Sequence, residues 1–363
     1  MKKNIGIVTL QGATNYGAVL QAYALQEYLK KNGNKVEIIN FYDNSLYGYY
    51  SPFIFARPIK IKTVIGKIIR YKKNKIQFSK FETFRKNRLQ LSPLLKKYNL
   101  LVDYAKKYDV LVVGSDQVWN ANINCKTKDV YYLNFSDTAK KYSYAASSGN
   151  ITSIESDCKY IDKYLNTFNG ISVRENDLKE FLKKHFNINT DLVCDPTLLL
   201  SKEEWLKISE EYNIKNEFIL VYMLNENENM IKFISELIQE KNMKVINIGK
   251  NISATNEMIE HAADVSPSQF IYLYNKASYI VTNSFHGTAF SLIFEKKFIT
   301  FGNGKLNSRM DTLLKSFKLG ERFINDKSIS FNKQMSILEK STIIDNSCSY
   351  VERSKEFINM FNL

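Results

Sequence analysis

The feature that most limits the fold of this chain is a recurring order of apolar run, polar glycine-bearing turn and amphipathic helix. The first apolar run spans residues 5–10, the turn spans 11–17, and helical apolar spacing covers 18–31. A second apolar run follows at 36–41. A strand, a helix and another strand in this order predict parallel strands, because the helix returns the chain to the starting edge of the sheet.

The same order returns in residues 279–294. Residues 279–282 are apolar and β-prone, and 289–293 have helical apolar spacing, so the chain is expected to turn at 283–287. Such a turn directs backbone N–H groups and the positive end of a helix dipole at a ligand. His286, one of three histidines, lies in the turn, and Gly287 would let a ligand approach the backbone. We expect an anionic ligand and a proton-transfer group here.

The length of 363 residues exceeds that of one comfortable core and predicts two domains. We expect an α/β fold with a Rossmann-like domain over residues 1–200, a second over 201–345, and a closing C-terminal helix over 346–363. The two domains are expected to face each other across a cleft. Each predicted strand ends in polar residues, and in parallel sheets such ends line a ligand crevice.

Residues 44–100 interrupt this order and are expected to form a basic helical insertion in the first domain. No acidic residue occurs from Asn44 to Phe81, and the apolar residues at 61, 64, 65, 68 and 69 have helical spacing. A basic amphipathic helix can lie on an anionic membrane or pack its apolar stripe on the domain. We favour packing and keep peripheral membrane contact as the alternative.

Composition limits the possible partners. The net charge of +14 favours phosphates, anionic sugars or lipid headgroups as ligands, while no nucleic-acid-binding module is recognisable. No apolar stretch is long enough to span a bilayer, and the N-terminus resembles no export signal, so a cytoplasmic protein is expected. The four cysteines are widely spaced and no side-chain cluster has metal-ligand spacing. We therefore expect reduced thiols, no metal and no cofactor.

Several short motifs resemble those of polysaccharide pyruvyl transferases. They are GATNYGA at 12–18, VGSDQVW at 113–119, SYAASSG at 143–149, ISVRE at 171–175, DPTLL at 195–199 and SFHG at 284–287. The resemblance implies a GT-B-like fold. It also implies transfer of pyruvate from phosphoenolpyruvate to sugar hydroxyls as a ketal, with release of phosphate, on a cell-surface glycan or its lipid-linked precursor.

The resemblance also suggests how the site residues divide. His286 is expected to transfer a proton, and Asp116 to act as a base toward the acceptor or merely to cap its turn. The other candidates bind substrates. The donor would be held by Arg174, Ser284, Gly287, Lys305 and Arg309, and the acceptor by Asn15, Tyr16, Gly17 and Trp119. Many family members have arginine at the place of Ser284, so Arg174, Lys305 and Arg309 are the candidate replacement cations.

Two other functions fit the same pattern. A nucleotide-sugar glycosyltransferase would need an acidic residue for the ribose after a strand of the second domain, and Asp264 is its only weak candidate. A non-catalytic member of a glycan-assembly complex would not depend on His286.

Overall fold

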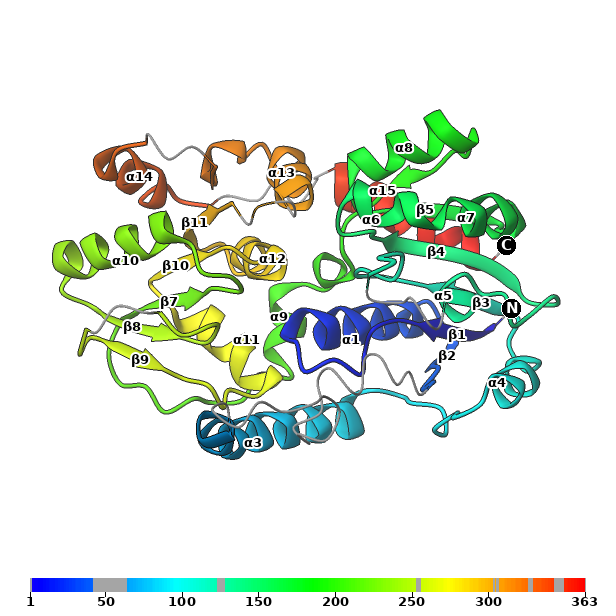
Figure 1. The fold of residues 1–363 in the computed structure, drawn as a ribbon, viewed down its shortest axis with the longest axis horizontal. Coiled ribbons are helices and arrows are strands. Elements are labelled where there is room, and N and C mark those ends of the chain that lie inside the picture. The colour runs from blue at the N-terminus through cyan, green and yellow to red at the C-terminus, as the bar shows by residue number, and fades with distance from the viewer. Residues whose placement is uncertain are drawn as a thin grey trace. The chain divides into compact units, whose positions relative to one another are not determined.

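The computed structural model divides the chain into two compact units. The first comprises Met1–Tyr71, Phe81–Leu200 and Ser349–Leu363, and the second Lys72–Lys80 and Ser201–Cys348. The structure describes residues 2–41, 64–122, 128–252, 256–302, 304, 307–325, 329–342 and 349–362, without the side chains of 64–74 and 362. Each unit is built around its own parallel sheet (Figure 1).

The sheet of the first unit has six strands in the order β2-β1-β3-β4-β5-β6. Each neighbouring pair is parallel. The strands are β1 (Asn4–Val8), β2 (Lys35–Ile38), β3 (Val110–Val113), β4 (Lys140–Ala146), β5 (Gly170–Val173) and β6 (Asp191–Leu192). Since β1 lies between β2 and β3, the chain reverses its direction of winding between β1 and β3, which makes this the switch point of the sheet.

Helices connect and cover these strands. They are α1 (Tyr16–Lys31), α3 (Val64–Arg88), α4 (Tyr98–Ala105), α5 (Lys128–Tyr131), α6 (Ile151–Ile154), α7 (Cys158–Tyr164), α8 (Asn176–Phe186) and α15 (Ser349–Asn359). A single helix was expected at 154–168, but the chain forms short segments there. The interruption falls at buried Asp157, whose backbone leaves helical geometry at ψ 10° and whose carboxylate binds Lys128 and Tyr132.

The closing helix α15 belongs to the first unit. The ring of Phe357 lies 6.4 Å from that of Tyr144, and the ring of Phe361, just beyond the helix, lies 4.6 Å from that of Tyr142. Tyr142 and Tyr144 alternate along β4, so they share one face of the sheet. The expected C-terminal helix therefore covers β4. The basic stripe expected at 61–69 lies outside the described residues, apart from the backbone of α3.

The second unit has the strand order β12-β11-β10-β7-β8-β9. Its strands are β7 (Phe218–Tyr222), β8 (Lys244–Asn247), β9 (Ile259–His261), β10 (Tyr279–Thr282), β11 (Lys297–Phe301) and β12 (Phe323–Ile324). With β7 counted as the first strand, this is the 3-2-1-4-5-6 order of a dinucleotide-binding domain, with its switch point between β7 and β10. The expectation of two Rossmann-like domains is confirmed.

The helices of the second unit follow its strands. They are α9 (Lys202–Leu206), α10 (Glu228–Lys241), α11 (Pro267–Lys276), α12 (Phe285–Ile293), α13 (Asn307–Ser316) and α14 (Phe331–Leu338). α9 ends well before residue 211, where the helix was expected to end. The short strands β9 and β12 and the helix α14 were not predicted, because segments of this length carry little periodic signal.

Candidate functional site

The switch point of the second unit is held together by the side chain of Asn283, the first residue after β10. Its Oδ1 accepts a hydrogen bond from the backbone N–H of Leu224 at 2.7 Å, and its Nδ2 donates to the carbonyl of Asn225 at 2.7 Å. Leu224 and Asn225 follow β7, the neighbouring strand. Asn283 therefore fixes the two loops that border the expected ligand crevice of a doubly wound sheet.

Ser284 is the N-cap of α12. Its backbone is extended (φ −102°, ψ 136°), and its Oγ accepts a hydrogen bond from the N–H of Gly287 at 3.2 Å. Asn283 and Ser284 are both residue types that can cap a helix. Ser284 caps α12, whereas Asn283 joins the loops after β7 and β10. The first turn of a helix presents N–H groups that lack an acceptor within the helix, together with the positive end of the dipole. The expected strand-to-helix turn is therefore present with Ser284 as its cap, and anion binding there stays a prediction.

His286 occupies the first turn of α12 and is 7% exposed. Its ring stands perpendicular to that of Phe285, with 5.2 Å between the centroids. The packing of Phe285 and the helix backbone thus restrict the imidazole to a small region beside the N-terminus of α12. The proton-transfer role expected of His286 stays a prediction.

Gly287 was expected to let a ligand approach the backbone, but the atoms that lie close to it belong to the protein itself. A Cβ at this position would lie 2.3 Å from Thr282 Oγ1 and 3.1 Å from Tyr274 Oη. Thr282 Oγ1 also accepts a hydrogen bond from the N–H of Ser284 at 3.0 Å and donates to Tyr222 O at 2.7 Å. The absence of a side chain at Gly287 therefore lets α12 pack against the end of β10.

Of the candidate cations in this unit, Arg309 lies next to the histidine-bearing turn. It is a buried residue of α13, and its guanidinium carbon lies 5.9 Å from the centre of the Phe285 ring. Contact between a guanidinium and an aromatic face is a favourable arrangement, and it places the positive charge of Arg309 beside the first turn of α12. Lys305, the other candidate, lies outside the described residues.

The first unit has a second cluster at its own switch point, between β1 and β3. Gln21 of α1 donates to Thr9 Oγ1 at 2.7 Å and accepts from the N–H of Ser115 at 3.2 Å, and Thr9 donates to Ser115 O at 3.1 Å. These buried bonds tie the loop after β1 to the loop after β3. They fix the backbone on which Asp116 stands.

Asp116 has a left-handed backbone conformation with φ 71°. Its carbonyl accepts hydrogen bonds from Val118 N at 2.7 Å and Ser147 N at 3.0 Å, and it forms a β-bridge with Ala146. Its side chain is 13% exposed, and Oδ1 lies 3.4 Å from Nη2 of Arg174. Asp116 is therefore a fixed, partly accessible carboxylate beside an arginine, and its backbone carbonyl rather than its carboxylate closes the turn.

Arg174 is 1% exposed and is held by carboxylates at the carboxyl end of β5. Its Nη1 lies 2.6 Å from Oδ2 of Asp195, which is fully buried. Burial alone would lower the pKa of Arg174, but the negative charges of Asp195, Asp116 and Glu175 outweigh burial and raise that pKa. Arg174 thus forms ion pairs with Asp195 and Asp116.

The expected acceptor residues are mostly packed or used for capping. Asn15 caps α1 by accepting from Ala18 N at 3.1 Å, and Gly17 is buried in the first turn of that helix. The Tyr16 ring packs 5.1 Å from Phe81. Trp119 is 1% exposed and stacks on Tyr132, and its indole N–H binds the carbonyl of Tyr131. Neither aromatic ring has an exposed face on which a sugar would stack in this conformation.

The structure therefore assembles the site residues in two groups. Ser284, His286, Gly287 and Arg309 lie together in the second unit, and Asp116 and Arg174 in the first. Asn283 and Asp195 also belong to these groups, although neither is among the site residues predicted from the sequence. Only their position in the sequence could have indicated a role, because each is a polar residue that follows a short strand. Asp264, considered for a ribose, forms an ion pair with Lys80 at 3.1 Å.

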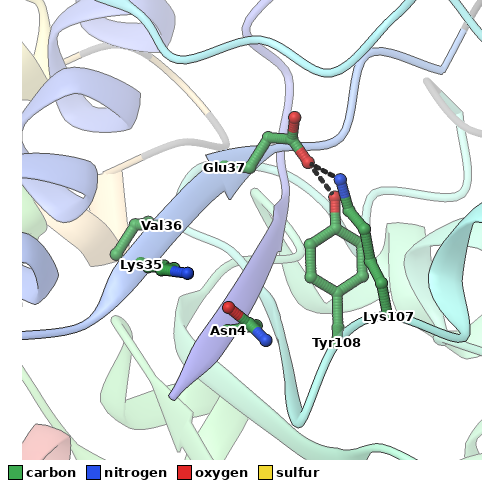
Figure 2. Close-up of a pocket in the computed structure, with 6 residues that line it drawn as sticks. All are labelled: Asn4, Lys35, Val36, Glu37, Lys107 and Tyr108. Carbon is green, nitrogen blue, oxygen red and sulfur yellow. Dashed lines mark hydrogen bonds and ion pairs between the residues drawn. The ribbon is translucent and has the colours of Figure 1, made fainter. Parts of the chain in front are cut away.

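A separate cavity lies at the opposite edge of the first sheet, where the strands begin. It has a volume of about 250 Å³ and is lined by Asn4, Lys35, Val36, Glu37, Lys107 and Tyr108. Figure 2 shows Lys107 and Tyr108 directed at Glu37, to which they bind at 2.6 and 2.5 Å. Because Glu37 and Lys107 are paired with each other and the cavity lies away from the carboxyl ends of the strands, we do not assign it to the candidate site.

Within the described residues, no group of three or more histidine, cysteine, aspartate or glutamate side chains is arranged to hold a metal ion. The same part of the chain contains no helix long and apolar enough to cross a membrane.

Comparison with known proteins identifies the family. A sequence model of polysaccharide pyruvyl transferases matches residues 15–305. A comparison with curated protein sequences finds no significant match. Similar solved structures include UDP-GlcNAc 2-epimerases from Methanocaldococcus jannaschii (14% identity, TM-score 0.55) and Neisseria meningitidis (12% identity, TM-score 0.54), each aligned over 100% of this chain and 99% of the other. At these identities the structural likeness establishes the fold alone.

Proposed function

Because this chain belongs to the polysaccharide pyruvyl transferase family, we propose that it transfers pyruvate from phosphoenolpyruvate to two hydroxyl groups of one sugar, forming a cyclic ketal. The acceptor we propose is a cell-surface glycan or its lipid-linked precursor, modified at the cytoplasmic face of a membrane. One observation carries the proposal. His286 lies in the capped first turn of α12, at the switch point of a Rossmann-like sheet, where an anionic donor and a proton-transfer group are needed together.

The reaction proposed has two bond-forming steps. Protonation of the methylene carbon of phosphoenolpyruvate makes its neighbouring carbon electron-deficient, and a first sugar hydroxyl adds there and loses its proton. A second hydroxyl then displaces the phosphate, which leaves as inorganic phosphate, while that hydroxyl also loses its proton. The site must supply a proton, accept protons and stabilise the negative charges of the donor.

In the second unit, His286 would transfer the proton, because imidazole exchanges protons near neutral pH. The first turn of α12, capped by Ser284, would bind the phosphate through backbone N–H groups, a role suited to a helix N-terminus. Arg309, whose guanidinium lies over Phe285, would contribute the cation expected where Ser284 replaces arginine. Lys305 remains a second prediction for that cation.

In the first unit, Asp116 would accept the proton of an acceptor hydroxyl. Its partly exposed carboxylate and fixed backbone suit this role. Arg174 would contact a donor carboxylate only through Nη2, because Nη1 is committed to the closer bond with Asp195. Nη2 lies 3.4 Å from Oδ1 of Asp116, a longer contact than that of Nη1 with Asp195. A ligand would therefore have to bind at Nη2.

The test is incubation of the protein with phosphoenolpyruvate and a panel of galactosides, glucosides and mannosides, free and lipid-linked. We expect phosphate release that depends on the acceptor, with a product carrying a pyruvate ketal. Turnover of a nucleotide sugar without turnover of phosphoenolpyruvate would replace this proposal with glycosyl transfer. Binding of glycans without either turnover would favour a non-catalytic role.

A further inference from the structure

The segment that enters α4 exposes three large apolar side chains within seven residues of sequence. Leu94, Tyr98 and Leu100 are 44%, 39% and 46% exposed, with the exposed residues Lys96 and Lys97 between them. We call these five residues the α4 patch. Elsewhere in the described part of the chain, exposed large apolar side chains are widely spaced in the sequence. They are Ile76, Leu206 and Leu224. Grouped exposed apolar side chains mark interaction surfaces, whereas single ones are ordinary.

The exposure of the α4 patch does not come from loose packing of this segment. Leu95 is buried, and its N–H donates to Asn40 O at 2.9 Å. Leu101 and Ala105 are fully buried in the core of the first unit. The segment therefore sends one set of apolar side chains inward, while Leu94, Tyr98 and Leu100 form a second set that the core does not use.

The charges of the α4 patch are positive. Lys96 and Lys97 form no ion pair with any residue that the structure describes. The acidic groups that act on Tyr98 are Asp129 and Asp137. The charge of Asp129 also acts on Lys163, and that of Asp137 also acts on Lys141. Lysines beside exposed leucines and a tyrosine complement a surface with an anionic outer layer and an apolar interior.

We propose that the α4 patch docks this protein on an anionic membrane surface. Leu94 and Leu100 would enter the acyl boundary, Tyr98 would lie at headgroup level, and the two lysines would bind lipid phosphates. The choice of a membrane rests on the proposed function in one respect, because a lipid-linked acceptor must be met at such a surface. The contact differs from the one considered for the helical stripe at 61–69, since it uses residues 94–100.

The test is co-sedimentation of the full-length protein with vesicles of phosphatidylcholine containing phosphatidylglycerol, and with vesicles of phosphatidylcholine alone. We expect binding to the anionic vesicles only. Replacing Lys96 and Lys97 by glutamine should weaken binding roughly thirtyfold, the factor expected for loss of two lysine–lipid attractions. The triple variant L94S/Y98S/L100S, which keeps both lysines, should weaken it by roughly tenfold or more, because three apolar insertions are lost.

Matched controls separate the patch from net charge and general surface polarity. K232Q/K315Q removes two lysines that are 78% and 70% exposed, and L206S removes a single exposed leucine. Both controls should bind vesicles as the wild type does.

Equal binding by the wild type and both patch variants, or no wild-type binding to anionic vesicles, would overturn the proposal. The proposal would also be overturned if the wild type were a dimer and the triple variant a monomer, because a second copy of the chain would then cover the patch. Vesicle binding needs no turnover, so its outcome is independent of the phosphoenolpyruvate assay.

Discussion

Nη1 of Arg174 lies 2.6 Å from Oδ2 of Asp195, and both side chains are inaccessible to solvent apart from 1% of the arginine. Asp195 also accepts hydrogen bonds from Ser115 Oγ at 3.0 Å and from Thr197 N and Oγ1 at 3.0 and 2.8 Å. One carboxylate thus links the loop after β3, the end of β5 and the turn after β6. This linkage ties together the carboxyl ends of β3, β5 and β6.

Replacing Asp195 by asparagine should destabilise the protein strongly. The substitution keeps the shape but leaves a buried guanidinium without its nearest counter-charge, which costs about 3–5 kcal/mol in comparable sites. Urea unfolding measures the change in free energy. The control is Asp103→Asn, which breaks the pair with Lys106 in which both side chains are about 70% exposed, and should cost less than about 1 kcal/mol. Similar losses for both variants would contradict a special role for the buried pair.

Replacing Gly287 by alanine should reduce stability because the new methyl group would lie 2.3 Å from Thr282 Oγ1. α12 must then shift away from β10, and overpacking of this kind costs about 1–3 kcal/mol. Gly320→Ala is the matched control, since the nearest atom to its added methyl group would lie 3.7 Å away. Thermal unfolding of the two variants gives the comparison. A stable G287A protein with unchanged unfolding would show that the turn has more room than we infer.

The sequence predicted the strand-to-helix turn at 283–287 well, because its signals are local. An apolar run, capping residues and helical spacing are readable from neighbours in the chain. The partners of Arg174 were not readable in this way. Asp195 lies 21 positions away in the chain, and only the pairing of β4, β5 and β6 brings it to the arginine. The burial of Trp119 has the same origin, because Tyr132 reaches it through tertiary packing.

Asn283→Ala should lower catalytic turnover without removing any atom of the proposed proton-transfer group. The Leu224 N–H and the Asn225 carbonyl would lose their shared partner, so the loops after β7 and β10 would no longer be fixed together. We expect kcat to fall about tenfold or more, as for a misplaced catalytic group, and stability to fall by about 1–3 kcal/mol. Asn283→Asp keeps only the bond from Leu224 and should give an intermediate kcat. A change in stability with unchanged kcat would make Asn283 purely structural.

Stability should depend on acidic pH through Glu339, which binds Lys241, Lys297 and Tyr279. Burial alone would raise the pKa of Glu339, but hydrogen bonds from these partners outweigh it and lower the pKa to about 2. A carboxyl group whose pKa is lowered by folding stabilises the fold at pH values above its unfolded-state pKa. This stabilisation is lost as the pH falls toward the folded-state pKa. Unfolding free energy should therefore decrease between about pH 4.5 and 2, by about 1 kcal/mol after solvent screening. Glu339→Gln should remove this component, whereas Glu321→Gln should retain it.

His286→Ala should abolish most pyruvyl transfer while the protein stays folded. General acid–base catalysis by a positioned side chain contributes about 10²–10⁴-fold, so kcat should fall by that order. His286→Gln keeps a hydrogen-bonding group of similar length but cannot exchange a proton near neutral pH, and it should be as inactive as the alanine variant. The control is His185→Ala, because His185 is an exposed residue of α8 whose ring contacts Phe181. Restored turnover in the glutamine variant would assign His286 to donor binding, since hydrogen bonding alone would then suffice.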